Sequence, residues 1–292
     1  MAKQGLQWQA DAAGVAVGKD GAAMVIVEMF KGKSIDEHRV ELVERKGTGH
    51  PDQICDSVME AVSLALCREY MARFGRILHH NIDKGLLVAG QVEKRFGGGR
   101  VVNPMELVIG DRATNRYGGS EIPVEEIVIE AARTWIGENL RFVDPERHIN
   151  FKVVLAPGSE ELGDIFQRPG DIYVANDTSA AVGYYPLSPT EKVVLGVERF
   201  LNGREFKERF PQTGEDVKVM AGRGGHYLDL TIAMPLLAPF VKSEQAYFEI
   251  KSAIHDEIRS FTENLAVFDQ LSINYNTLDV RGRGLGGVYL SL

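Results

Sequence analysis

The chain has 292 residues, of which 44% are hydrophobic and 25% charged, a composition typical of a globular protein with a sizeable buried core. Its 33 basic and 41 acidic side chains give a formal net charge of −8, which argues against a general surface for nucleic acid or anionic membranes. No apolar run reaches the length of a membrane span and no secretory signal pattern occurs, so we expect a cytoplasmic protein.

Residues 1–22 are rich in Gly, Ala, Gln and Asp and show little periodicity. We therefore expect a flexible N-terminal extension there and a folded region over residues 23–292. The apolar run at 23–30 opens this region as a predicted strand.

A long helix is predicted from about residue 52 to residue 74. The apolar residues that recur at helical spacing, and that we expect to be buried, are Ile54, Val58, Val62, Leu66 and Tyr70. The two cysteines, Cys55 and Cys67, are twelve residues apart on this helix, which excludes a disulfide between them while the helix is straight. This favours a reducing compartment.

Helices and strands alternate along the rest of the chain. Ser188 and Glu191 have the spacing of a capping box, and Gly203 is a weak point in the helix that follows. The other predicted elements are extended segments at 77–95 and 101–112 around a turn at 97–99, helices at 124–140, 191–210 and 243–265, a hairpin of 217–221 with 227–235, and strands at 148–155, 171–175, 271–276 and 287–292. The recurring unit of strand, helix, strand, strand predicts an α+β fold with helices on one face of mixed sheets.

The junction at residues 44–56, Glu-Arg-Lys-Gly-Thr-Gly-His-Pro-Asp-Gln-Ile-Cys-Asp, is the most informative segment. Gly47 and Gly49 permit conformations that a side chain would forbid, and exposed amides at a helix start attract an anion. Asp52 and Asp56 are spaced to share one helical face. Carboxylates beside an anion indicate a cation such as Mg²⁺ between them, because bare negative charges repel. The junction therefore predicts a metal-nucleotide site.

Five blocks of the sequence follow the order of a known family. They are the junction, Ile-Leu-His-His-Asn-Ile-Asp-Lys at 77–84, Phe-Gly-Gly-Gly at 96–99, Pro-Gly-Ser at 157–159 and Ala-Asn-Asp-Thr at 175–178. On these blocks the chain resembles the archaeal-type S-adenosylmethionine synthetases, or methionine adenosyltransferases. The resemblance implies three similar subdomains around a pseudo-threefold axis, with the last part incomplete here, and a homodimer or higher oligomer with sites at the subunit interface.

The resemblance also implies the reaction and its cofactors. The sulfur of methionine attacks C5′ of the ATP ribose and expels the triphosphate, which is cleaved to phosphate and diphosphate. The implied cofactors are Mg²⁺, as two ions, and K⁺. Charge that shifts onto the triphosphate oxygens calls for divalent cations, Lys or Arg side chains, and a donor near the breaking bond, all held in place beforehand.

Residues of the junction are the first candidates for these roles. His50 is the candidate catalytic donor near the breaking bond, and Asp52 matches the metal-linked aspartate of the family. Lys46, Gly47 and Gly49 are candidates for holding the phosphates. A histidine that merely caps the helix remains the alternative for His50.

Asp83 and Lys84 belong to the second block and are candidates for lining the nucleotide site. A surface ion pair is the alternative for these two residues. His79 and His80 are adjacent in an extended segment and cannot share a face. A zinc site is therefore not favoured, and neither the two histidines nor the cysteines have the short paired spacings of one.

Two further segments supply candidate substrate ligands. Asn176 and Asp177 follow the strand predicted at 171–175, and by resemblance Asp177 holds the ammonium group of methionine; an Asx-turn is the alternative. Lys218 could reach the triphosphate as a second catalytic residue, or be a solvated strand lysine. Arg223, in the following turn, is a further candidate for substrate binding.

The resemblance stops where the family's C-terminal part would begin. Relatives continue with a glycine-rich acidic loop and a Gly-Lys-Asn-Pro segment that complete the triphosphate and metal site. We expect this sequence to be part of a longer chain; a short inactive product and a site completed by a second polypeptide are the alternatives. A non-catalytic ATP-binding or regulatory subunit of the same fold and a simple ATP hydrolase are the rival functions.

Overall fold

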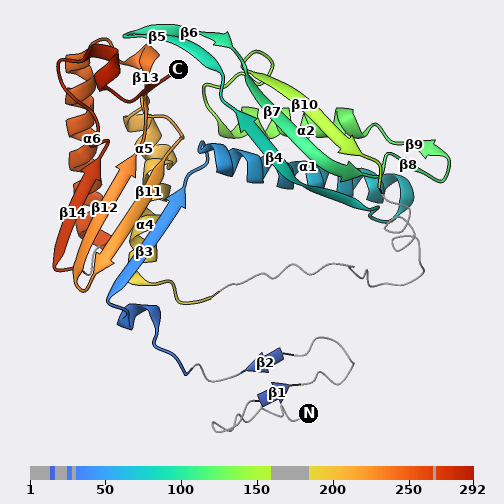
Figure 1. Ribbon diagram of the computed structural model, residues 1–292, viewed down its shortest axis with the longest axis horizontal. Helices are drawn as coiled ribbons and strands as arrows, with labels where there is room; N and C mark the ends of the chain where they lie inside the picture. The colour runs from blue at the N-terminus through green and yellow to red at the C-terminus, as the bar shows by residue number, and fades with distance from the viewer. Residues whose placement is uncertain (1–13, 17–24, 28–30, 159–183, 266–267) are drawn as a thin grey trace. The chain divides into compact units, whose positions relative to one another are not determined.

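The chain divides into two compact units, Met1–Arg39 and Val40–Leu292. The structure, a computed structural model, describes residues 14–16, 25–27, 31–158, 184–265 and 268–292 (Figure 1). In the first unit, β1 (Gly14–Ala16) pairs antiparallel with β2 (Val25–Val27), and a 3-10 helix, η1 (Ile35–Glu37), follows. Strand β2 lies within the strand predicted at 23–30.

The first sheet of the larger unit is mixed and has the order β10-β7-β4. Strand β7 (Met105–Ala113) runs antiparallel to β4 (His80–Val88) and parallel to β10 (Ile149–Ala156). A parallel pair requires a crossover, and α2 (Val124–Asn139) supplies it. Helix α2 packs beside α1 (Pro51–Phe74) over one face of the sheet (Figure 1). All five apolar residues predicted for the buried face of α1 are buried.

The second sheet is also mixed and has the order β14-β12-β11-β3. Strand β11 (Lys218–Gly224) lies between β3 (Val40–Lys46) and β12 (Tyr227–Ala233) and is antiparallel to both, whereas β14 (Gln270–Tyr275) runs parallel to β12. The predicted hairpin of β11 and β12 is confirmed, but β11 continues through Gly224, so Arg223 lies in the strand and not in the predicted turn. Gly225 takes a φ of +59° in its turn, a conformation that favours glycine.

Helices α4 (Pro189–Leu201) and α6 (Glu244–Leu265) pack against each other beside this sheet. The predicted capping box begins α4, where the Ser188 hydroxyl accepts from the Glu191 amide at 3.0 Å and the Ser188 amide donates to the Glu191 carboxylate at 2.7 Å. The helix predicted at 191–210 divides at its weak point, because Gly203 becomes the N-cap of a separate helix, α5 (Arg204–Arg209).

The remaining elements are short. They are β5 (Gln91–Arg95), β6 (Gly98–Asn103), β8 (Arg116–Tyr117), β9 (Ser120–Glu121), β13 (Leu236–Leu237), η2 (Ala238–Phe240), η3 (Gly284–Gly287) and β15 (Leu290–Ser291). The extended segment predicted at 101–112 divides at Pro104, which has no N–H to donate to a ladder. The strand predicted at 287–292 is confirmed only over the two residues of β15.

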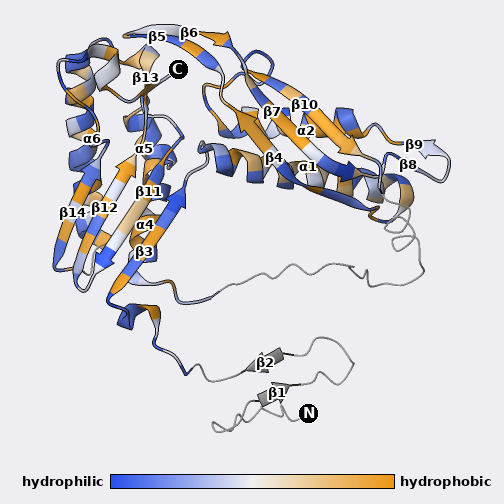
Figure 2. Cartoon of the chain, viewed as in Figure 1, coloured by the Kyte–Doolittle hydropathy of each residue, from blue (hydrophilic) through white to orange (hydrophobic). Residues whose placement is uncertain are grey.

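Each large sheet has one face against helices and one face without them. Apolar and polar residues alternate along the strands, as Figure 2 shows, so the two faces differ in side chains. The helix-free faces nevertheless carry exposed apolar side chains, namely Leu42, Leu86, Val88, Val154 and Met220. The α+β class with helices on one face of mixed sheets is confirmed, and the pseudo-threefold arrangement stays a prediction.

Candidate functional site

The turn between β3 and α1 is held against the segment that precedes β11. The Gly47 amide donates to the Val217 carbonyl at 2.7 Å, and the Gly49 amide donates to the Glu215 carbonyl at 3.0 Å. A Cβ atom on Gly49 would lie 2.5 Å from the Glu215 carbonyl carbon, which is closer than atoms can pack. The exposed amides that we expected at these glycines are therefore not found, because protein carbonyls accept both N–H groups. Close backbone contact is what requires glycine at position 49, whereas the side chains of Asn202 and Glu198 occupy the corresponding space at Gly47.

His50 is the N-cap of α1. Its backbone is extended, and its Nδ1 accepts a hydrogen bond from the Asp52 amide at 3.2 Å. A neutral imidazole whose Nδ1 accepts carries its proton on Nε2. The capping role considered for His50 therefore leaves Nε2 as a hydrogen-bond donor. The side chain is only 19% exposed, so this donor is held in a partly enclosed position.

Charged side chains of β3, β11 and α1 form a cluster beside His50. Lys46 Nζ lies 2.5 Å from Asp52 Oδ2 and 3.7 Å from Glu44 Oε1, and Lys218 Nζ lies 2.8 Å from Glu44 Oε2. Lys46 and Lys218 are directly paired in the sheet register. The structure thus brings four of the predicted site residues together: Lys46, His50, Asp52 and Lys218.

The cluster keeps its carboxylates ionised. The hydrogen bond from Lys46 lowers the pKa of Asp52, and the hydrogen bond from Lys218 lowers the pKa of Glu44. In turn, the hydrogen bond to Asp52 raises the pKa of Lys46. At neutral pH the site therefore presents two ammonium groups and two carboxylates, which can bind phosphate oxygens and a cation, respectively.

Two acidic residues of this region were not assigned a role from the sequence. Glu44 bridges the two lysines, and the period of two along β3, which places it on the same face as Lys46, could have identified it. Asp216 is half-buried, and burial raises the pKa of its carboxyl while nearby His50 and a hydrogen bond with Tyr289 lower it. Both residues enlarge the candidate site.

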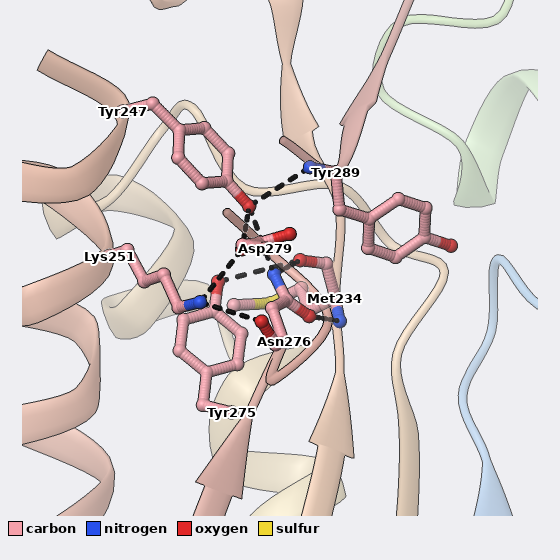
Figure 3. A network of polar contacts seen from close by, with 7 residues as sticks. All are labelled: Met234, Tyr247, Lys251, Tyr275, Asn276, Asp279 and Tyr289. Atoms are coloured by element: carbon pink, nitrogen blue, oxygen red, sulfur yellow. Dashed lines mark hydrogen bonds and ion pairs between the residues drawn. The ribbon is translucent and has the colours of Figure 1, made fainter. Parts of the chain in front are cut away.

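A polar network fixes the backbone that carries Tyr289 (Figure 3). The Tyr289 amide donates to the Tyr247 hydroxyl at 3.2 Å, and that hydroxyl donates to Asp279 at 2.7 Å. Lys251 donates to the same Asp279 oxygen at 2.8 Å. The side-chain amide of Asn276 donates from Nδ2 to the Met234 carbonyl at 2.8 Å, and its Oδ1 accepts from the Met234 amide at 3.0 Å.

Asp83 and Lys84 form an exposed ion pair of 2.7 Å at a bulge in β4. Beside them, Asp111 has a φ of +100° and accepts from the Asn81 side chain at 2.9 Å. Within the described ranges, neither Asp83 nor Lys84 hydrogen-bonds to the cluster around Lys46. The structure therefore shows the surface ion pair that we considered as the alternative, and gives no contact for a nucleotide role.

Arg223 lies on the other face of the second sheet. It is 7% exposed and donates to Glu41 at 3.1 Å, and Glu41 also accepts from the Ser188 hydroxyl at 2.6 Å. Arg223 and Lys218 are five residues apart on β11, so their side chains point to opposite faces. The structure therefore does not bring Arg223 to the cluster. Asn176 and Asp177 lie outside the described residues.

Asp52 is the carboxylate best placed to hold Mg²⁺. Among the residues that the structure describes, no three His, Cys, Asp or Glu side chains form a group that could hold a metal ion. Mg²⁺ commonly takes one or two carboxylates together with substrate phosphates, and the exposed Asp52 beside Lys46 fits that donor set. Cys55 and Cys67 are both free, and burial raises the pKa of each thiol, so neither is a reactive thiolate.

Comparisons with known proteins place this geometry in a family. The profile of the S-adenosylmethionine synthetase (AdoMet synthetase) family matches residues 23–292. The S-adenosylmethionine synthase of Aeropyrum pernix is 43% identical over 263 residues, which cover 89% of this chain and 65% of that protein. That of Pyrococcus furiosus is 41% identical over 266 residues, covering 90% and 66%.

Two further matches were found. The probable S-adenosylmethionine synthase of Aquifex aeolicus is 41% identical over 258 residues, covering 87% of this chain and 64% of that protein. A solved structure described as an unusual S-adenosylmethionine synthetase from Campylobacter jejuni aligns with a TM-score of 0.49 at 11% identity, covering 87% and 60%. The chain spans just under two thirds of the length of these curated relatives. No helix in the described part of the chain is long and apolar enough to cross a membrane. The family profile and the relatives show that this chain belongs to the S-adenosylmethionine synthetase family.

Proposed function

We propose that this chain acts in methionine adenosyl transfer, which forms S-adenosylmethionine from ATP and methionine and releases phosphate and diphosphate. The observation that carries the proposal is the convergence of Lys46, His50, Asp52 and Lys218 at the start of α1 in a member of this family. Cationic side chains and a fixed N–H donor are what a departing triphosphate needs.

His50 and Lys218 are the proposed catalytic residues. As the methionine sulfur bonds to C5′ of ATP, the bond from C5′ to the triphosphate oxygen breaks and negative charge moves onto that oxygen. The Nε2–H of His50 donates toward the developing charge, and Lys46 and Lys218 stabilise the phosphate oxygens. These groups are held by strand register and helix capping before substrate binds, which lowers the cost of reorganisation.

Asp52 is the proposed protein ligand of Mg²⁺, which neutralises triphosphate charge when bound. Two Mg²⁺ ions and K⁺ are proposed cofactors on the family resemblance. Asp83 and Lys84 for the nucleotide, Asn176 and Asp177 for methionine, and Arg223 remain residue proposals that rest on matched family positions. For Arg223, the buried pair with Glu41 favours a structural role instead.

We also propose a homodimer in the cytoplasm. Exposed apolar side chains on both helix-free sheet faces, such as Leu42 at 76% and Leu86 at 59% exposure, support burial against a second copy, because removing apolar surface from water favours association. The two free cysteines are compatible with a reducing compartment.

Mass-spectrometric detection of S-adenosylmethionine tests the function. The chain is incubated with ATP, methionine, Mg²⁺ and K⁺, with a control that lacks methionine and a second control with Asp52→Asn. Methionine-dependent product that falls in the Asp52→Asn variant supports the proposal. Phosphate release that does not respond to methionine would instead identify an ATP hydrolase. Tight ATP binding without any turnover would favour the regulatory subunit.

A further inference from the structure

A short segment, residues 213–217, hydrogen-bonds to the glycine turn at residues 47–49. The carbonyls of Glu215 and Val217 accept the amides of Gly49 and Gly47, at 3.0 and 2.7 Å. Atoms of Glu215 and Asp216 also fill the space where a Cβ on Gly49 would lie, and the Val217 carbonyl oxygen lies 3.1 Å from the corresponding position at Gly47. Whatever fixes the position of this segment therefore fixes the turn that ends at His50.

Two basic side chains from separate elements hold the same segment. Lys207 of α5 donates to the Gly214 carbonyl at 2.6 Å and to the Thr213 hydroxyl at 3.2 Å. Arg141, which follows α2, donates through Nη2 to the Thr213 carbonyl at 2.5 Å, and its Nε is paired with the Glu215 carboxylate. Lys207 lies in a helix beside the second sheet, and Arg141 follows a helix that packs on the first sheet, so residues near both sheets contact the segment.

A lysine at position 207 is costly for stability alone. Its side chain is 7% exposed, and within the described residues no carboxylate lies within ion-pair distance of its ammonium group. Burial lowers the pKa of Lys207 to about 7, an effect that Glu215 opposes and Arg141 reinforces. An apolar side chain of similar length would avoid this desolvation. The hydrogen bonds to residues 213 and 214 are what the lysine supplies and an apolar residue cannot.

We propose that Lys207 and Arg141 are positioning residues that clamp residues 213–215 and thereby hold the turn of Gly47 to His50 in its binding geometry. The clamp acts mainly through the backbone carbonyls of Thr213 and Gly214, and within the described residues neither side chain hydrogen-bonds to the cluster around Lys46. Its effect on catalysis rests on the proposed function: a shift of the His50 donor away from the breaking bond reduces turnover, because proton and charge placement tolerate little displacement.

Hydrogen exchange at the turn tests the clamp without any activity. In the 292-residue chain, peptide-level exchange is followed for a peptide that covers Gly47, Gly49 and His50, in Lys207→Met and in Arg141→Met. Loss of either clamp residue should accelerate exchange of these amides about tenfold, since a weakened support lets the turn open locally. Arg141→Lys keeps a cationic donor and should recover part of the protection.

Two variants serve as controls. Arg209 lies in the same short helix as Lys207 and pairs with Glu257. Arg209→Met removes this cation and should leave hydrogen exchange of the turn unchanged. Ile258→Val weakens the core of the same half of the unit, where Ile258 is fully buried, and it shows what modest global destabilisation does to the peptide.

The outcomes separate the clamp from the enzyme. Unchanged exchange of the turn in both Lys207→Met and Arg141→Met, or acceleration no greater than in Ile258→Val, overturns the clamp. Suppose that the clamp variants accelerate exchange and that the parent chain makes S-adenosylmethionine. In the variants, kcat should then fall at least about tenfold while the ATP dissociation constant changes little. A loss of ATP affinity as large as the loss of kcat would overturn the positioning role. If exchange accelerates but no variant and no parent chain makes product, the clamp stands and the proposed function fails.

Discussion

Replacing Lys207 with methionine should change how stability depends on pH. The pKa of Lys207 is lowered from 10.5 to about 7 in the folded chain, so between these values the unfolded chain binds a proton that the folded chain does not. The free energy of unfolding of the parent chain therefore rises with pH through this window, and Lys207→Met removes that contribution. Below pH 7 the lysine is charged in both states, and the contribution no longer changes.

The magnitude follows from one proton. A full difference of one bound proton gives a slope of about 1.4 kcal/mol per pH unit, approached near the middle of the window. The difference in unfolding free energy, parent minus Lys207→Met, should therefore rise by about 2.5 kcal/mol between pH 7.5 and 9.5. Other groups that titrate in this range are common to both proteins and cancel in the difference.

Urea unfolding at three pH values measures this difference. Lys192→Met, at an exposed lysine of α4, is the control, and its difference from the parent should stay flat with pH. A flat difference for Lys207→Met as well would refute the reasoning, because it would mean that Lys207 stays protonated in the folded chain, stabilised by Glu215 and Glu198 against burial and Arg141.

Three other substitutions test separate features of the site and its support. Asp52→Asn should reduce Mg²⁺-dependent activity at least about tenfold in a Mg²⁺ titration while the urea-measured stability changes by about 0.5 kcal/mol or less, as for an exposed residue. Gly49→Ala should destabilise the chain by about 1–3 kcal/mol in urea, because the added Cβ overlaps the backbone of Glu215; a neutral result would show that the turn can move. Asn276→Ala should cost about 1–3 kcal/mol in the same assay, because it leaves the Met234 amide unpaired and leaves the Met234 carbonyl with only the 3.4 Å hydrogen bond from Tyr275; a smaller loss would mean that water replaces the amide.

Local signals in the sequence predicted most elements. The helical spacing of apolar residues located α1 within a residue of its true start, and the Ser188 capping box located the start of α4. Glycine and proline, which change the backbone locally, explain the break at Gly203 and the division at Pro104. These are properties of neighbours in the sequence, so they can be read without knowing the fold.

The support of the site could not be predicted in this way. Arg141 meets Glu215 across 74 residues of sequence, and neither residue lies in a recognisable motif. Similarly, the sequence placed Lys218 and Arg223 in one candidate set, but the pleat of β11 separates them onto two faces. Contacts between distant segments depend on which strands pair and in which register, and no periodicity within one segment specifies that.

The two ends of β3 differ in how readily their charged residues can change partners. At one end Glu41 and Arg223 are buried together, so separating them would leave an unpaired charge in the interior. At the other end Lys46 and Lys218 pair with carboxylates at the surface. Ion pairs at the surface are weak because water and salt screen them. An arriving triphosphate can therefore take both ammonium groups from Asp52 and Glu44 at little cost. The freed Asp52 carboxylate then becomes available to a metal ion only when the polyphosphate is present, which would make metal binding depend on nucleotide binding.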